Sequence, residues 1–102
     1  MEETRIAGAA GIAAGEIGAF EAGDIEVAVA NVGGELLAFR NECTHQHCTL
    51  DDGDLEDGSI ICACHGSKFD LRTGEVLGPP ATEPIEVYKA TVDGDDLIIS
   101  GG

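Results

Sequence analysis

Two short cysteine–histidine pairs constrain the fold of this chain more than any other feature. All four cysteines and all three histidines lie between Cys43 and His65. Cys43-x-His45 and Cys62-x-x-His65 each combine a thiol with an imidazole, and sixteen residues separate the two pairs. Both groups are common metal ligands, so a pair at each of two loop tips can close four ligands around one site. The pattern predicts a fold that brings these two loops together.

The two remaining cysteines, Cys48 and Cys64, each lie within five residues of one of the pairs. This symmetry suggests a second link between the same loops. From the residues alone, other interpretations stay open. Cys₂His₂ is also a structural zinc pattern, although a zinc finger usually has half of its site on a helix, and this region reads as strands and turns. A zinc site of four cysteines, or two disulfides in one of three pairings, leaves the histidine spacing unexplained.

With the extra cysteines and the Gly66-Ser67 that follows the second pair, the motif resembles that of Rieske [2Fe–2S] proteins. In Rieske centres two histidines replace two cysteines on one of the irons, which raises the reduction potential. The resemblance covers nearly the whole chain and implies one [2Fe–2S] cluster per chain. The ligands that it implies are Cys43 and Cys62 on the inner iron, and His45 and His65 on the outer iron near the surface.

The resemblance also implies roles for residues beside the ligands. Cys48 and Cys64 match the disulfide cysteines of the cytochrome bc-type branch, which many soluble oxygenase ferredoxins of the family lack. In bc-type relatives a serine at the position of Ser67 and a tyrosine at the position of Phe69 donate hydrogen bonds toward cluster sulfurs and tune the potential. Because this chain has phenylalanine there, we expect a potential below that of bc-type centres and above that of ferredoxins lacking both donors.

A further departure lies between His45 and Cys48, where the bc-type pattern has Leu-Gly and this chain has Gln46-His47. His47 is an alternative ligand, but the two cysteine–histidine pairs already fill the site. We therefore expect His47 on the exposed rim of the site, where it shapes docking.

The net charge of −15, from twenty acidic and five basic side chains, limits the possible partners. Nucleic acids and anionic membranes attract basic surfaces, so neither is an expected partner. The charge favours steering toward a basic docking patch on a partner protein. It also suits a soluble monomer, for which an acidic surface serves solubility alone.

The expected compartment is the cytoplasm. No stretch approaches the roughly twenty apolar residues of a membrane helix, so no membrane insertion is expected. The acidic start, Met1-Glu2-Glu3, is unlike a secretory signal. The expected disulfide argues mildly against this compartment, since cytosolic thiols are usually reduced. An export signal or an anchor removed from the chain stays an alternative.

The rest of the chain reads as short strands separated by glycine turns. Alternating apolar residues predict a half-buried strand over Ile25–Ala30, and Asp93-Gly94 predicts a hairpin turn. The acidic run Leu50–Gly58 predicts two turns with a solvated face rather than a calcium loop, because it lacks the EF-hand glutamate. The other expected strands are Thr4–Ala7, Glu16–Glu21, Leu36–Arg40, Ser59–Ile61, Ser67–Asp70, Glu75–Leu77, Ile85–Val92 and Leu97–Ser100.

These strands predict a single all-β domain over residues 1–102, an antiparallel sandwich or open barrel. The cluster-binding region, at about 41–70, is expected to form two hairpin loops at one end. Residues 78–81, Gly-Pro-Pro-Ala, match in position the proline loop that covers the cluster in the Rieske family. The core is poor in aromatic residues, with three Phe, one Tyr and no Trp, and gains stability from a metal clip.

The expected function is one-electron transfer by a Rieske-type ferredoxin. It would pass electrons from a flavin-dependent reductase to a terminal oxygenase, both with basic docking surfaces. One alternative is a Rieske subunit or domain of a quinol- or metalloid-oxidising complex, which the extra cysteine pair favours. Another is a zinc-stabilised binding module without redox activity. No nucleophile, base or substrate pocket stands out in the sequence, so we expect an electron-transfer component rather than an enzyme.

Overall fold

The computed structural model describes residues 3–23, 25–43, 48–64, 66–79 and 81–101. Within these ranges the chain forms two antiparallel β-sheets and one turn of 3₁₀ helix, η1 (Ala9–Gly11). The first part of the chain contributes strands β1 (Thr4–Ile6), β2 (Ile17–Ala22), β3 (Ile25–Val32) and β4 (Glu35–Arg40). The second part contributes β5 (Asp54–Glu56), β6 (Ser59–Ile61), β7 (Lys68–Asp70), β8 (Val76–Gly78), β9 (Val87–Asp93) and β10 (Asp96–Gly101).

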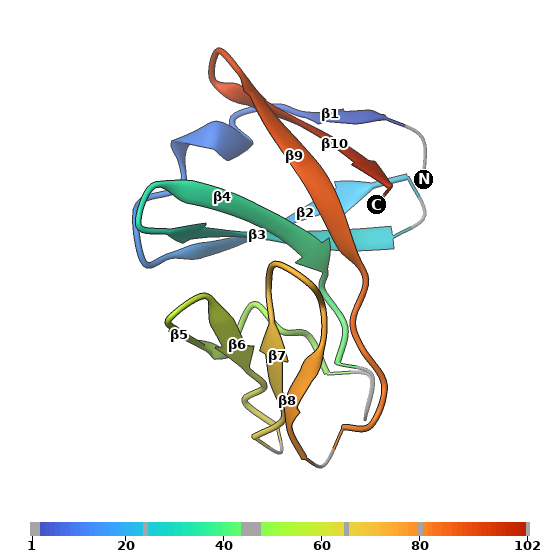
Figure 1. The fold of residues 1–102 in the computed structure, drawn as a ribbon. Coiled ribbons are helices and arrows are strands. Elements are labelled where there is room, and N and C mark those ends of the chain that lie inside the picture. Colours follow the sequence, from blue (N-terminus) through green and yellow to red (C-terminus); the bar gives the residue numbers. More distant parts are fainter. Residues whose placement is uncertain (1–2, 24, 44–47, 65, 80, 102) are drawn as a thin grey trace.

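The larger sheet has the strand order β1-β10-β9-β4-β3-β2, and its two edge strands come into contact. It therefore curls into a nearly closed barrel (Figure 1). The smaller sheet, β5-β6-β7-β8, is a meander that lies beside the barrel. The expected antiparallel all-β architecture is confirmed. No helix in the described part of the chain has the length and apolar character needed to cross a membrane.

The small sheet is an insertion between two neighbouring barrel strands. β4 pairs with β9, and just beyond the pair the Arg40 N–H donates to the Glu86 carbonyl oxygen over 2.9 Å. The chain thus leaves the barrel and returns to it at adjacent points. The described residues between 41 and 86, which include Cys43 and Cys62, are consequently held outside one end of the barrel, in the lower part of Figure 1.

Strand β3 is buried on both faces over its central residues, where the sequence predicted a half-buried strand. Val27 and Val29 belong to the apolar core of the barrel, whereas Ala28 and Ala30 belong to a second core shared with the small sheet. All four side chains are fully buried. The alternation indicated one buried face, but it could not show that a second sheet covers the other. The small alanine side chains let that sheet pack closely.

The other predicted strands are present within one or two residues of their expected bounds. One further strand, β5 (Asp54–Glu56), was not predicted, because it lies in the acidic run that was expected to form two turns. It pairs Leu55 with Ile60 of β6, and a strand of three residues is too short for an alternating pattern to show. Within residues 48–64, no group of three or more His, Cys, Asp or Glu side chains is arranged to hold a metal ion.

An ion-pair cluster ties β1 to the turn between β9 and β10, at the end of the barrel away from the small sheet. The Arg5 guanidinium contacts the carboxylates of Asp93 at 2.6 Å and Asp96 at 3.0 Å. The Gly8 N–H donates to Asp96 over 3.1 Å. This backbone hydrogen bond, together with Arg5, holds the pKa of Asp96 below its usual value.

Candidate metal centre

The first cysteine loop spans residues 43–48, and Cys43, its first residue, lies shortly after β4. The Cys43 N–H donates to the Cys48 carbonyl oxygen over 2.8 Å and closes the base of the loop. Asn41, which is buried, accepts the N–H groups of Leu50 and Asp51 at 2.7 and 2.8 Å. The two ends of this loop are therefore held together by a backbone bond and by a buried side chain below it.

The second cysteine loop, residues 62–67, lies at the tip of the hairpin formed by β6 and β7. The Cys62 N–H donates to the Ser67 carbonyl oxygen over 2.8 Å, and the Gly66 N–H donates to the Cys62 carbonyl oxygen over 2.9 Å. Gly66 has φ = 78°, in the left-handed region that glycine adopts without steric cost. A side chain at this position would strain the turn that follows the second cysteine–histidine pair.

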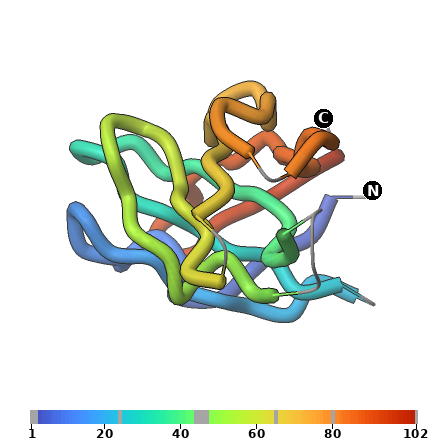
Figure 2. The backbone as a smooth tube through the Cα atoms, turned by 90° about the horizontal axis from the view of Figure 1, so that it is seen from below, coloured from blue at the N-terminus to red at the C-terminus, as the bar shows by residue number. Residues whose placement is uncertain are grey.

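The two loops are closed by the same kind of backbone hydrogen bond, and a disulfide joins them. In each, a cysteine N–H donates to the carbonyl oxygen five residues further along the chain. A disulfide links Cys48 to Cys64, with their Cα atoms 6.6 Å apart, so the disulfide that the resemblance implied is present. Figure 2 views the molecule from this end, and the described stretches next to the disulfide, in green and yellow, lie beside each other.

The four cysteines differ in their surroundings. Cys43 and Cys62 are free, each 2% exposed, and both belong to the core shared by the barrel and the small sheet. Cys48 is half-buried and Cys64 is exposed. Two free thiols at equivalent positions of two linked loops fit the inner-iron ligands of a [2Fe–2S] cluster, because thiolates bind iron and the apolar surroundings shield them from solvent.

The three histidines, His45, His47 and His65, lie outside the described residues. The structure therefore places the two cysteines of the expected ligand set and leaves the two histidines as predictions. The same holds for the expected position of His47 on the rim. In the described part of the chain, no group of three or more His, Cys, Asp or Glu side chains could hold a metal ion.

The proline loop, residues 78–81, is tied to the second cysteine loop. The Ala81 N–H donates to Ser67 Oγ over 3.1 Å. Ser67 is fully buried and Ala81 is 3% exposed. Because Ser67 Oγ acts as an acceptor in this bond, its own hydroxyl proton is available for donation. Pro80 lies outside the described residues, so the covering role expected for this loop stays a prediction. Sequence reasoning gave no sign of the Ala81 contact.

Phe69 is fully buried in the core shared by the two sheets and pairs with Ile60 of β6. It is thus a packing residue of the small sheet. The tuning role assigned to Phe69 stays a prediction.

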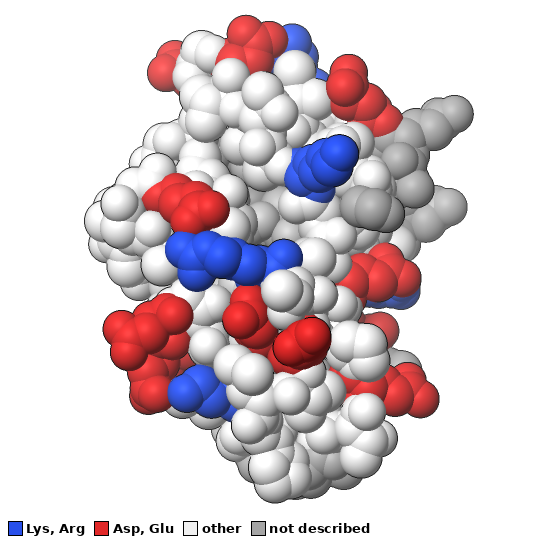
Figure 3. Space-filling view, viewed as in Figure 1, with Lys and Arg blue, Asp and Glu red and all other residues white. Residues whose placement is uncertain are grey.

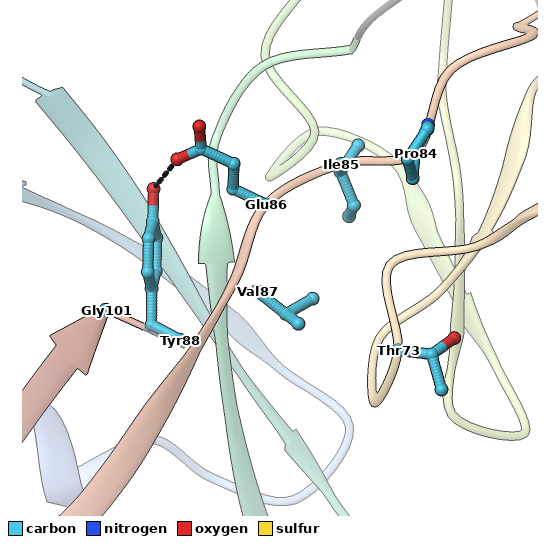
Figure 4. A pocket seen from close by; sticks show the side chains of 7 residues that line it. All are labelled: Thr73, Pro84, Ile85, Glu86, Val87, Tyr88 and Gly101. Atoms are coloured by element: carbon cyan, nitrogen blue, oxygen red, sulfur yellow. Dashed lines mark hydrogen bonds between the residues drawn. The ribbon is translucent and has the colours of Figure 1, made fainter. Parts of the chain in front are cut away.

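A surface pocket of about 540 Å³ lies where the chain returns to the barrel, and none of the four cysteines lines it. Figure 4 shows Tyr88 Oη donating to Glu86 over 2.9 Å on one side, with Thr73 of the small sheet on the other. Burial, followed by the hydrogen bond to Glu86, raises the pKa of Tyr88 well above its usual value. Tyr88 therefore stays protonated at neutral pH.

The fold and the site together define a class: small β proteins in which two cysteine loops, joined by a disulfide, lie outside one end of a barrel. Residues 2–89 match the Rieske [2Fe-2S] domain family, and the chain belongs to this family.

The curated relatives support the same assignment. The ferredoxin component of biphenyl 2,3-dioxygenase from Rhodococcus jostii RHA1 is 36% identical over 99 residues, which cover 97% of this chain and 92% of that protein. The ferredoxin subunit of 3-phenylpropionate/cinnamic acid dioxygenase from Escherichia coli K12 is 39% identical over 74 residues, which cover 72% and 70%.

Solved structures agree over the whole chain. The ferredoxin of carbazole 1,9a-dioxygenase from Nocardioides aromaticivorans IC177 superposes with a TM-score of 0.89 at 29% identity, covering 100% of both chains. The Sphingomonas yanoikuyae B1 ferredoxin gives 0.88 at 31% identity, covering 99% of this chain and 100% of the other. The chain is accordingly an electron carrier with a [2Fe–2S] cluster, not a zinc module and not itself an enzyme.

Proposed function

We propose that the chain receives one electron from a flavin-dependent reductase and passes it to the terminal oxygenase of an aromatic-ring dioxygenase system. The observation that carries this proposal is the similarity, over nearly the full length of both proteins, to the ferredoxin component of biphenyl 2,3-dioxygenase. A solved complex of oxygenase and ferredoxin in carbazole 1,9a-dioxygenase contains a chain that is 28% identical to this one, with a TM-score of 0.86.

The proposed cluster ligands are Cys43, His45, Cys62 and His65. A [2Fe–2S] cluster bound by these residues would supply one-electron transfer. The two thiolates balance the charge of the oxidised cluster, so that it carries no net charge, and the neutral imidazoles make the added electron easier to accommodate. The buried cysteines would keep water from the inner iron, and the ring nitrogens of His45 and His65 that do not bind iron would be available for hydrogen bonds to a partner.

Single substitutions test this ligand set. Protein expressed with ample iron should show the visible absorption and EPR spectra of a Rieske centre. Replacing any one of the four ligands by Ala should abolish both spectra, whereas His47→Ala should leave them nearly unchanged. A colourless protein that contains zinc, or a spectrum that survives Cys43→Ala, would overturn the assignment.

The docking surface is proposed at the cysteine-loop end, to which three stretches without acidic or basic residues contribute. None of the twenty acidic and five basic residues lies within 43–50, 59–67 or 76–82. In Figure 3 this end, at the bottom, is white, and the red acidic side chains lie above it. Leu77 of β8 is 50% exposed there, and Pro79 is exposed beside it. An uncharged tip can lose its water at low cost when a partner covers it.

The surrounding acids then act at a distance, by steering the chain toward a basic surface on the partner. The electron-transfer rate to the oxygenase should therefore fall as salt rises, since the Debye length is already about 10 Å at 0.1 M. Rapid mixing of the reduced protein with an oxidised aromatic-ring dioxygenase, without oxygen, measures this rate from the visible spectrum. The absence of any transfer at low salt would contradict the proposed partner.

A matched pair of variants separates steering from docking. Leu77 and Val92 are both large, exposed apolar residues, at 50% and 57%, and they lie on β8 and β9. Leu77→Glu and Val92→Glu add the same charge, near the cysteine loops and near the opposite end respectively. Leu77→Glu should slow transfer by about tenfold, the effect of losing roughly 1.4 kcal/mol at an interface, and Val92→Glu should have little effect. Equal effects would place docking elsewhere.

The Cys48–Cys64 disulfide is the one observation that favours the second candidate, a Rieske subunit of a quinol- or metalloid-oxidising complex. Reduction of the oxidised protein by a quinol, faster than by a flavin-dependent reductase, would support that candidate. The cytoplasmic location and the single domain over residues 1–102 stay predictions.

A further inference from the structure

Asn41 is a buried polar residue between the barrel and the first cysteine loop. It follows β4 directly and is 4% exposed. Its Oδ1 accepts the N–H groups of Leu50 and Asp51 at 2.7 and 2.8 Å. Its Nδ2 donates to Glu26 Oε1 at 2.8 Å and to Asp51 Oδ1 at 2.9 Å. A side-chain amide has two acceptor and two donor positions, so all four are used.

These contacts connect the barrel to both ends of the loop. Asn41 stands two residues before Cys43, and Leu50 stands two residues after Cys48. The Asn41 N–H also donates to the Glu26 carbonyl oxygen over 2.9 Å. The base of the first cysteine loop is therefore fixed to strand β3 through one side chain and its own backbone.

These four hydrogen bonds require a side chain at position 41 that donates to the two carboxylates and accepts the two backbone N–H groups. Aspartate at this position would present oxygen to the carboxylates of Glu26 and Asp51, so it would replace two hydrogen bonds by repulsion. Alanine would leave the buried N–H of Leu50 without its acceptor. A longer amide would not fit the same four atoms without moving the chain.

We propose that Asn41 is a positioning residue for the cluster: by fixing the base of the first cysteine loop, it sets the position of the Cys43 thiolate and so the potential and retention of the cluster. This inference rests on the proposed role of Cys43 as a ligand. Asn41 itself does not touch the cluster and acts only through the loop.

Asn31 provides a matched control. It is also an asparagine that uses both ends of its amide, since Nδ2 donates to the Ile12 carbonyl oxygen at 2.7 Å and Oδ1 accepts the Gly34 N–H at 2.7 Å. It lies in β3 like Glu26, but at the end of the strand that leads into β4. Loss of its hydrogen bonds should lower stability without moving the first cysteine loop.

The experiment compares Asn41→Asp and Asn41→Ala with Asn31→Asp and Asn31→Ala in the cluster-containing protein. The readouts are the EPR g values of the reduced protein, the reduction potential, the rate of bleaching in a chelator and the melting temperature. We expect the Asn41 variants to bleach about tenfold faster or more, with shifted g values and potential. The Asn31 variants should melt earlier while keeping the g values and the potential.

A double variant keeps the test decisive even if the single ones fold poorly. In Asn41→Asp/Glu26→Gln the amide and the carboxylate exchange places, which restores the hydrogen bond between these positions and the total charge. It should recover part of the lost cluster retention and bring the g values back toward the original.

If the Asn41 variants lose only melting temperature, as the Asn31 variants do, or if the double variant recovers melting temperature but not the g values, the positioning role is refuted. If the unmodified protein shows no Rieske EPR signal, the ligand assignment fails instead, which keeps the two failures distinct.

Discussion

Replacing Ser67 by alanine tests hydrogen-bond tuning of the cluster. The structure shows Ser67 fully buried, with its Oγ accepting the Ala81 N–H over 3.1 Å. Its own proton is then free to be donated toward a cluster sulfur, which stabilises the more negative, reduced state. Ser67→Ala removes both interactions, so it should lower the reduction potential and the stability together.

The two magnitudes follow from the two bonds. A hydrogen bond to a charged group contributes roughly 1.5–3 kcal/mol. If about half of this distinguishes the redox states, the potential falls on the order of 30–70 mV, at roughly 59 mV per tenfold for one electron. Without Ser67 Oγ the buried Ala81 N–H has no acceptor, which costs about 1–3 kcal/mol of folding free energy. Each kcal/mol lost should lower the melting temperature by roughly 4–8 °C in a domain of this size.

Film voltammetry and thermal unfolding measure the two effects separately. Ser59→Ala is the control, since Ser59 is another buried serine of the small sheet, at 7% exposure. It should leave the potential unchanged. If Ser67→Ala lowers the melting temperature but not the potential, the hydroxyl serves only the proline loop, and tuning by this residue is refuted.

Three further predictions follow from other parts of the structure. Phe69→Tyr should raise the potential by a similar amount, on the order of 30–70 mV, and an unchanged potential in voltammetry would make Phe69 a packing residue alone. Cys48→Ser should shorten the cluster lifetime in a chelator more than it changes the potential, because a disulfide between loops already joined by a cluster adds a few kcal/mol at most. The Gly8 N–H and Arg5 lower the pKa of Asp96. The ionised Asp96 carboxylate therefore stabilises the fold at pH values above its unfolded pKa of about 3.9. This stabilisation is lost as the pH falls through the lower pKa of the folded state. Asp96→Asn should therefore destabilise the protein in urea at pH 7, and a difference that persists unchanged at the most acid pH would contradict this sign.

The strand pattern was readable because it is local. Alternation over Ile25–Ala30 and the turn at Asp93-Gly94 depend on neighbouring residues alone, and the corresponding strands formed. Strand β5 (Asp54–Glu56) was missed because three residues carry too little periodic signal, and its acids suggested solvent-exposed turns. The burial of Ala28 and Ala30 was missed for another reason: it depends on a sheet formed by residues much later in the chain.

The candidate site divides in the same way. The family resemblance carried by the cysteine and histidine motif implied the cluster type and the disulfide, whereas the residues alone left a zinc site and other disulfide pairings open. The supports of the two loops were not visible. Asn41 contacts Glu26, 15 positions earlier in the chain, and Ser67 contacts Ala81, 14 positions later. An isolated asparagine or serine carries no sign of such a partner.

By itself, then, the sequence determined the acidic charge and the short strands of this protein, and its motif indicated the cluster through a family resemblance. Only the tertiary structure decided that the chain leaves the barrel after β4 and returns to it at the paired strand β9. It also decided that Asn41 holds the base of the first cysteine loop and that Ser67 contacts Ala81. The physical reason is distance along the chain. Ligand chemistry and strand periodicity belong to single residues and their neighbours, whereas the position of a loop depends on hydrogen bonds and packing between segments that only the complete fold brings together.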